Sequence, residues 1–164
     1  MKNTFTCILI MGVAGSGKTT IGSKLSSKIN GFFIEADDFH GENNINKMSE
    51  GIPLNDADRY DWLLKIKDQI ISRIDKQNLV VACSALKDKY RQLIGVKNYK
   101  LVYLKVDKDT ARNRINSRKE HFMPDTLVDS QFSILEEPKD AMIFNQSLTQ
   151  DEIVNSIVKE FTFD

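Results

Sequence analysis

The sequence predicts an α/β fold, in which a doubly wound, parallel, five-stranded sheet carries helices on both faces. Short runs of apolar residues alternate along the chain with longer segments in which apolar residues recur at the helical period. The short runs are apolar at successive positions, as expected for parallel strands that are covered on both faces. Right-handed crossovers between such strands produce a doubly wound sheet, and ligands bind beyond the carboxyl ends of its strands.

Five strands and five helices are expected in alternating order. The strands are the apolar runs at residues 5–11, 32–34, 79–83, 101–104 and 142–144. The helices are the periodic segments at residues 18–29, 58–76, 87–94, about 109–117 and 149–161. The helix at 58–76 shows the period most clearly, through Trp62, Leu63, Ile66, Ile70, Ile71 and Ile74.

Length and charge indicate a single domain, residues 1–164, of the kind found in soluble enzymes. Basic and acidic side chains number 23 each, so the chain has no overall field that would hold nucleic acid or an anionic membrane. No apolar run approaches the ~20 residues that span a bilayer, and the run at 7–11 is too short for a signal peptide. We therefore expect a cytoplasmic protein, with Cys7 and Cys83 as buried thiols rather than a disulfide.

Residues 12–19, Gly-Val-Ala-Gly-Ser-Gly-Lys-Thr, match the P-loop pattern G-x-x-x-x-G-K-[ST] between a predicted strand and a predicted helix. Glycines let the backbone curl so that successive N–H groups point at one phosphate, and the following helix N-terminus adds donors. Lys18 would contact the β- and γ-phosphates, and the Thr19 hydroxyl would ligate Mg²⁺. The expected ATP-binding residues are Gly12, Ala14, Gly15, Ser16, Gly17, Lys18, Thr19 and Thr20.

A P-loop is shared by kinases, GTPases, motors and nucleotide sensors. The guanine-binding pattern N-K-x-D is incomplete here, because residues 46–49 read Asn-Lys-Met-Ser. An Arg-rich stretch at residues 112–119 and the small size favour a phosphoryl-transfer kinase with a closing lid. Such an enzyme also needs a carboxylate for the acceptor hydroxyl and cations for the acceptor. Asp37 or Asp38 and the arginines Arg59 and Arg91 are candidates, although these charges could also serve as a helix cap or a solvated face.

Four longer strings resemble the bacterial-type gluconokinases, and the resemblance covers nearly the whole chain. Residues 44–63 read N-I-x-K-M-x-x-G-x-P-L-x-D-x-D-R-x-x-W-L and resemble the substrate-side segment of that family. Residues 83–91, C-S-A-L-K-x-x-Y-R, resemble its segment after the third strand. Residues 118–124, R-K-x-H-F-M-P, and 130–138, S-Q-F-x-x-L-E-x-P, resemble its lid and the helix after the lid.

The resemblance implies ATP-dependent phosphorylation of D-gluconate to 6-phospho-D-gluconate, in carbohydrate acid and pentose phosphate metabolism. It implies an adenylate- or shikimate-kinase-like P-loop kinase with a mobile lid at about residues 112–125, and the ability to form a homodimer. Asp37 would orient the acceptor hydroxyl, while Lys18, Arg114 and Arg118 act on the transferred phosphate. Ser84 would join Thr19 near Mg²⁺. The implied substrate-binding residues are Asp37, His40, Arg59, Lys87, Arg91 and His121.

The chain departs from the family pattern at three places. Glu35-Ala36 precede Asp37 where the family commonly has Asp-Gly, Gly41 replaces a proline, and Glu120 replaces a glycine. The first departure leaves the role of Glu35 beside Mg²⁺ open, and the last leaves the lid contacts open. Two other functions also remain open at this stage: a kinase for another small polyhydroxy acid such as shikimate, and a non-catalytic nucleotide-binding sensor.

Overall fold

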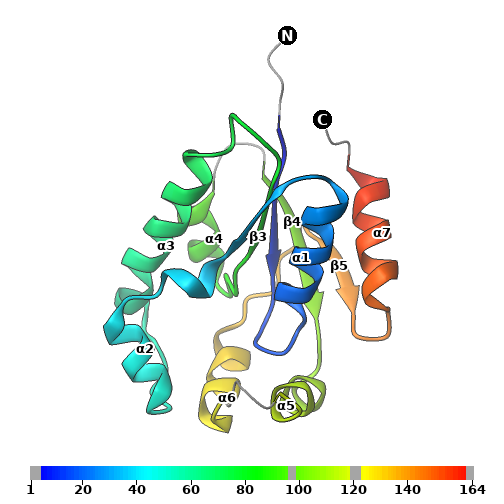
Figure 1. The fold of residues 1–164 in the computed structure, drawn as a ribbon. Coiled ribbons are helices and arrows are strands. Elements are labelled where there is room, and N and C mark those ends of the chain that lie inside the picture. The colour runs from blue at the N-terminus through cyan, green and yellow to red at the C-terminus, as the bar shows by residue number, and fades with distance from the viewer. Residues whose placement is uncertain (1–4, 96–98, 119–122, 162–164) are drawn as a thin grey trace.

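The computed structural model describes residues 5–95, 99–118 and 123–161, and its centre is a five-stranded sheet (Figure 1). The strands lie in the order β2-β3-β1-β4-β5, and all neighbouring strands are parallel. The predicted α/β fold and its five-stranded sheet are therefore confirmed. The strands are β1 (Cys7–Met11), β2 (Phe32–Glu35), β3 (Leu79–Ala82), β4 (Tyr99–Lys105) and β5 (Met142–Asn145).

Helices cover both faces of the sheet, and the central strand β1 packs against both layers. Ile8 and Ile10 belong to the apolar cluster formed with α1 and α7, while Leu9 and Met11 belong to the cluster formed with α3 and α4. This division follows from the alternation of side chains along a strand. The covering helices are α1 (Lys18–Lys28), α3 (Asp56–Ile71), α4 (Asp88–Ile94) and α7 (Gln150–Glu160).

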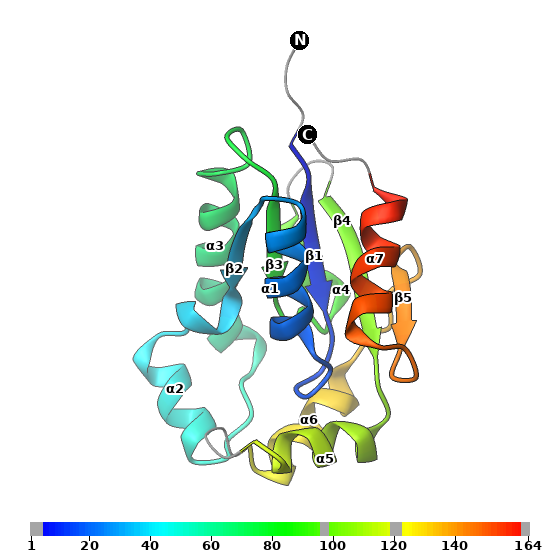
Figure 2. The ribbon, with the colours of Figure 1, turned by 45° about the vertical axis from the view of Figure 1, so that its right-hand side comes forward.

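The remaining helical segments lie beyond the carboxyl ends of the strands. Figures 1 and 2 show α2, α5 and α6 below the sheet, at the end to which the strand arrows point. This is the edge where ligands bind in doubly wound folds. The segments are the 3₁₀ turn η1 (Ala36–Phe39) and the helices α2 (Glu42–Ser49), α5 (Lys108–Asn116) and α6 (Asp125–Ile134).

Helix α2 was not predicted, because its sequence has no apolar period. Its Ile45 is 54% exposed, and the residue that the helix buries is the polar Asn44. The Asn44 side-chain amide donates to the carbonyl oxygen of Asp58 at 2.9 Å, which ties α2 to α3. Helix α2 is therefore held by a polar contact that hydrophobic patterning does not reveal.

Helix α3 begins and ends earlier than predicted, at Asp56 and Ile71 instead of 58 and 76. A capping box sets its start: the Asn55 side chain accepts the Asp58 N–H at 2.8 Å, and the Asp58 carboxylate accepts the Asn55 N–H at 3.0 Å. The predicted apolar face was wrong for Ile71, which is 52% exposed. Ile74 packs against the core from the turn that follows the helix.

The two cysteines are buried free thiols, as expected. Burial raises the pKa of both Cys7 and Cys83 to about 12, so neither is a thiolate near neutral pH. Across the described part of the chain, no helix is both long enough and apolar enough to span a bilayer.

Replacing Asn55 by alanine should lower the free energy of unfolding by about 1 kcal/mol, because the capping box loses its side-chain acceptor. Urea denaturation monitored by circular dichroism measures the change. Asn43→Ala, at an exposed position in the first turn of α2, is the matched control and should leave stability nearly unchanged. Equal stability losses in the two variants would contradict the assignment of α3's start to this cap.

Candidate active site

The loop between β1 and α1 has the curled backbone that its motif predicts. Gly15 and Gly17 have φ of 81° and 99°, a region that glycine adopts without steric cost. Gly15 is also tightly packed, since a Cβ there would lie 2.7 Å from the Ala111 carbonyl oxygen on α5. Gly17 is the N-cap of α1. The loop therefore presents main-chain donors and a helix N-terminus to the same space, which suits an anion.

Lys18 brings a half-buried positive charge to this loop. Its Nζ donates a hydrogen bond to the Val13 carbonyl oxygen at 2.9 Å. Burial lowers the pKa of Lys18, and the nearby carboxylate of Asp37 opposes that shift. An ammonium group removed from water is costly unless anions surround it. The loop and Lys18 together therefore suit the phosphates of a nucleotide.

The Thr19 hydroxyl of α1 and carboxylates from β2 and η1 lie together beside the loop. The Thr19 hydroxyl donates to one carboxylate oxygen of Glu35 at 2.5 Å, and the other oxygen accepts the Asp37 N–H at 3.4 Å. Burial raises the pKa of Glu35, and the hydrogen bond from Thr19 opposes the rise. These residues line a cavity of about 640 Å³, which we call the loop cavity, together with Lys18 and Asp38.

The oxygen atoms of the loop cavity fit Mg²⁺, which protein sites usually hold through one or two carboxylates, substrate phosphates and waters. Among the described residues, no group of three or more His, Cys, Asp or Glu side chains could hold a metal ion alone. Thr19 lies in this cavity, as expected for a ligand. Ser84 lines the neighbouring cavity instead, and its carbonyl oxygen accepts the Gly12 N–H at 3.4 Å.

The neighbouring cavity, of about 220 Å³, is where an acceptor could lie beside the loop, and we call it the acceptor cavity. Lys18 and Asp37 line both the acceptor cavity and the loop cavity. The other polar lining residues are His40, Arg59, Ser84, Ser130 and Gln131, and the apolar ones include Met48, Pro53, Leu54, Trp62, Met123 and Leu127. A carboxylate and an ammonium therefore stand where the two cavities meet.

His40 has a defined orientation in the acceptor cavity. Its ring stacks on the Trp62 indole, with centroids 4.2 Å apart and an interplanar angle of 16°. The Asn44 amide nitrogen, which already donates to the Asp58 carbonyl, lies 3.2 Å from His40 Nδ1. Nδ1 is then the acceptor, and the proton of the neutral ring is on Nε2, 3.8 Å from an Asp37 carboxylate oxygen. Burial lowers the pKa of His40, so the neutral ring is favoured near pH 7.

Arg59 is 9% exposed and reaches the acceptor cavity from the first turns of α3. Its Nη1 donates to the Leu54 carbonyl oxygen and to the Tyr90 hydroxyl, the latter at 3.3 Å. The Tyr90 hydroxyl in turn donates to Asp56. A guanidinium has five N–H donors in one plane. With Nη1 used in this way, Nη2 and Nε remain the donors that can serve an anion in the cavity.

Lys87 and Arg91 were expected to bind substrate, and that role stays a prediction, because in this structure both side chains contact other protein groups. Neither lines the loop cavity or the acceptor cavity. Lys87 pairs with Asp56 at 3.0 Å. Arg91 is 4% exposed, and its guanidinium donates to three main-chain carbonyls, those of Ala85 at 2.7 Å, Leu86 at 3.2 Å and Glu136 at 2.9 Å. A guanidinium used in this way joins chain segments. His121 lies outside the described residues.

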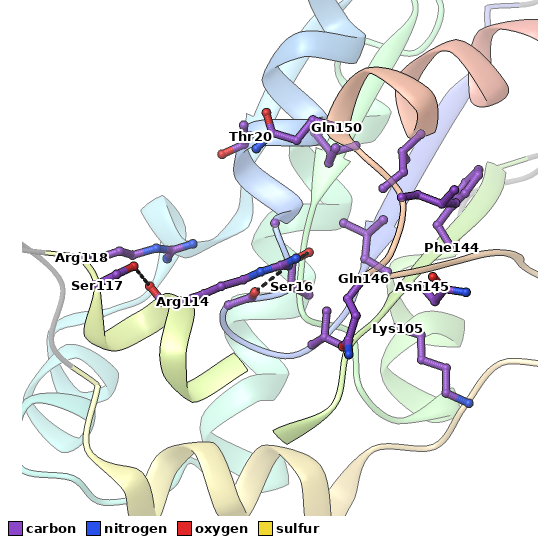
Figure 3. A pocket seen from close by; sticks show the side chains of 17 residues that line it. Ser16, Thr20, Lys105, Arg114, Ser117, Arg118, Phe144, Asn145, Gln146 and Gln150 are labelled. Carbon is purple, nitrogen blue, oxygen red and sulfur yellow. Dashed lines mark hydrogen bonds between the residues drawn. The ribbon is translucent and has the colours of Figure 1, made fainter. Parts of the chain in front are cut away.

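A third cavity, of about 330 Å³, lies between the loop, α5 and the β5–α7 connection, and we call it the α5 cavity. Figure 3 shows the Arg114 side chain reaching from α5 to the loop beside Ser16. Its Nη1 donates to the carbonyl oxygens of Gly15 and Ser16 at 3.3 and 3.4 Å. Arg118 lines both this cavity and the loop cavity. The lid role of residues 112–125 stays a prediction, with residues 119–122 outside the described part.

Sequence reasoning missed the residues on the far side of the α5 cavity. Lys105, Asn145, Gln146 and Gln150 line it there. Gln146 is held by Asp107: the Asp107 N–H donates to its oxygen at 2.8 Å, and its nitrogen donates to the Asp107 carboxylate at 2.5 Å. Lys105 and Asn145 end β4 and β5 at the carboxyl edge of the sheet, and this position was the available signal. Thr20, predicted to bind nucleotide, lines the same cavity.

Comparison with known proteins gives matches over most of the chain. The family model described as "Shikimate kinase" matches residues 14–162. "Probable gluconokinase" of Dictyostelium discoideum is 42% identical over 159 residues, which cover 92% of this chain and 80% of that protein. "Thermosensitive gluconokinase" of Escherichia coli (strain K12) is 42% identical over 134 residues, covering 80% and 72%. The crystal structure of a gluconokinase from Sinorhizobium meliloti 1021 has a TM-score of 0.84 at 36% identity, covering 96% of this chain and 91% of that one.

These matches cover most of the chain, and the fold of the solved relative agrees with the sheet described above. The resemblance seen in the sequence is therefore confirmed. The chain belongs to the gluconokinase family, and over residues 14–162 it also matches the shikimate kinase family model.

Proposed function

We propose that the protein is a gluconokinase, which transfers the γ-phosphoryl group of ATP to the 6-hydroxyl of D-gluconate. The names of its relatives support this proposal, since proteins 42% identical to it are named gluconokinases. The observation that carries it is the position of Asp37 and Lys18, which line both the loop cavity and the acceptor cavity. A cytoplasmic location and a homodimer are further parts of the proposal.

The nucleotide would lie along the P-loop. Its base and ribose fit the α5 cavity, and its phosphates fit the loop amides, with Lys18 at the β- and γ-phosphates. Mg²⁺, when bound, would neutralise negative charge on the phosphates, and Thr19 with Glu35 would hold it. Arg114 and Arg118 lie on the other side of the loop, where guanidinium groups can pair with phosphate oxygens.

The acceptor would lie with its reacting hydroxyl at Asp37. This carboxylate accepts the hydroxyl's hydrogen bond, aims the oxygen at phosphorus and takes the proton late, because phosphoryl transfer passes through a loose transition state. The Nε2 atom of His40 lies 3.8 Å from an Asp37 carboxylate oxygen, so the two side chains reach the cavity side by side. The apolar walls of the cavity limit competing water, which would otherwise hydrolyse ATP.

The acceptor's carboxylate would pair with Arg59. The guanidinium matches a carboxylate because two parallel N–H groups can bind its two oxygens at once. Hydrogen bonds to Leu54 and Tyr90 fix the guanidinium plane before the ligand arrives. A pre-oriented cation of this kind favours an acid over a neutral sugar.

The decisive experiment measures ADP release in a coupled assay with Mg-ATP and a panel of acceptors. D-Gluconate should give fast turnover, and shikimate and other aldonates should give much less. Fast turnover with shikimate alone would support the other acceptor class. ATP binding without acceptor-stimulated ADP release would indicate a nucleotide sensor and would refute the proposal.

Asp37→Asn should lower kcat by at least about 100-fold, the scale of a positioned general base, with ATP binding largely kept. Steady-state kinetics and equilibrium titration with ATP measure the two effects. Asp38→Asn is the matched control, because Asp38 lines the loop cavity but not the acceptor cavity, and it should lose less. Near-normal turnover by Asp37→Asn would rule out the assigned role.

Arg59→Ala should raise the Michaelis constant for gluconate by about 10- to 100-fold, because a charge-assisted pair with the carboxylate is lost. The ATP constant should change little. Arg73→Ala is the control, since Arg73 stacks on the Phe32 ring away from the acceptor cavity. If Arg59→Ala abolishes ATP binding while the protein stays folded, the placement of Arg59 at the acceptor is wrong.

A further inference from the structure

Helix α6 forms one wall of the acceptor cavity and connects it to the P-loop. Leu127, Ser130 and Gln131 of this helix line the cavity. At its first turn, the Thr126 hydroxyl donates to the Gly51 carbonyl oxygen at 3.1 Å, in the segment between α2 and α3. Figures 1 and 2 show α6 beside α5 below the sheet. The helix therefore spans from the substrate-side segment to the loop.

Several contacts fix the position of α6. The Asp129 carboxylate accepts a hydrogen bond from Arg112 at 2.7 Å and pairs with Lys108 at 3.2 Å, both on α5. Just after the helix, the Glu136 N–H donates to the Leu86 carbonyl oxygen at 2.8 Å, and the Glu136 carbonyl oxygen accepts from the buried Arg91 at 2.9 Å. The residues between these anchors consequently have little freedom to shift.

Gln131 lies between those anchors, and its side chain contacts the P-loop directly. Its carboxamide oxygen accepts the Ala14 N–H at 2.7 Å. Ala14 lines the loop cavity and the acceptor cavity, and it is not part of the α5 cavity lining. The Ala14 amide is thus at the acceptor end of the loop, where the transferred phosphoryl group would lie.

The two ends of a carboxamide differ, because the oxygen only accepts hydrogen bonds and the nitrogen only donates them. With the oxygen bound to Ala14, the NH₂ group is the end left to serve a ligand in the cavity that Gln131 lines. The Ala14 N–H is occupied by the Gln131 oxygen and cannot serve a phosphate. The NH₂ group of the same carboxamide offers two N–H donors in its place. Negative charge that develops on the phosphoryl oxygens is stabilised by donors that are already in position.

We propose that Gln131 is a further catalytic residue, whose oxygen holds the Ala14 amide while its NH₂ group donates to an oxygen of the transferring phosphoryl group. This inference rests on the proposed function, because it needs a phosphoryl group and an acceptor in the two cavities. The rival explanation is that Gln131 only clamps α6 to the loop. The catalytic role and the clamp predict different kcat values for a variant that keeps the side-chain oxygen and lacks the nitrogen.

Gln131→Glu makes that change. Its carboxylate can still accept the Ala14 N–H, but it donates nothing until it is protonated. We expect kcat with gluconate to fall by about 10- to 100-fold, the worth of a hydrogen bond to a charged group. ADP affinity and melting temperature should match the wild type. The ratio of variant to wild-type kcat should rise as the pH is lowered, because a protonated carboxyl group regains one donor.

Gln131→Met removes the donor without adding a charge, and it also removes the oxygen that accepts the Ala14 N–H. It should lower kcat, and because methionine has no titratable group, the loss should not recover at low pH. Ser133→Ala is the matched control on the exposed side of α6, where the Ser133 hydroxyl donates to the Ser130 carbonyl oxygen. This control should keep the wild-type kcat.

Two results would overturn the inference. One is wild-type kcat in either Gln131 variant. The other is a parallel loss of kcat, ADP affinity and melting temperature in the glutamate variant, which would indicate a clamp. The wild type is assayed first: absence of gluconate-stimulated ADP release there would refute the proposed function, whereas a normal wild type with unaffected variants would refute only the role of Gln131.

Discussion

The half-buried ammonium of Lys18 is the constraint on which the site depends. A charge taken out of water must be balanced by other charges or dipoles. In this structure the balance comes from the Val13 carbonyl oxygen and from the carboxylates of Asp37 and Glu35, both of which raise the pKa that burial lowers. Glu35 accepts the Thr19 hydroxyl, and Asp37 lines both the loop cavity and the acceptor cavity. The charge that we propose to bind the nucleotide thus also holds the two carboxylates beside the acceptor cavity.

The buried strands and the hydrogen bonds between helices position different parts of the site. β1 and β3 are buried throughout and place the loop and Ser84 at one edge. Hydrogen bonds add to apolar packing in the cavity walls beyond that edge: Asn44 joins α2 to α3, and Arg91 joins α4 to the segment after α6. A buried guanidinium that donates to carbonyls in this way costs desolvation, and it links α4 to the segment after α6.

The sequence predicted the sheet, its covering helices and the P-loop, because these depend on apolar periods and on one specific motif. It did not predict which arginine lines the acceptor cavity. Arg59 and Arg91 both lie on helices near apolar residues, and the direction of each guanidinium depends on carbonyls from distant segments. Gln131 belonged to a recognised string, yet an uncharged amide gives no signal of its own. Its role emerges only when α6 is placed beside Ala14.

Glu35 shows how a departure from the family pattern can preserve a contact. Its side chain is one methylene longer than aspartate, and its two oxygens reach two different elements: the Thr19 hydroxyl on α1 and the Asp37 N–H on η1. One carboxylate therefore links the start of α1 to the turn that carries Asp37 and leads to His40. Because burial raises its pKa, its charge depends on donors and cations nearby. A nucleotide with its cation would strengthen that charge, and the same contact would then hold Asp37 toward the acceptor.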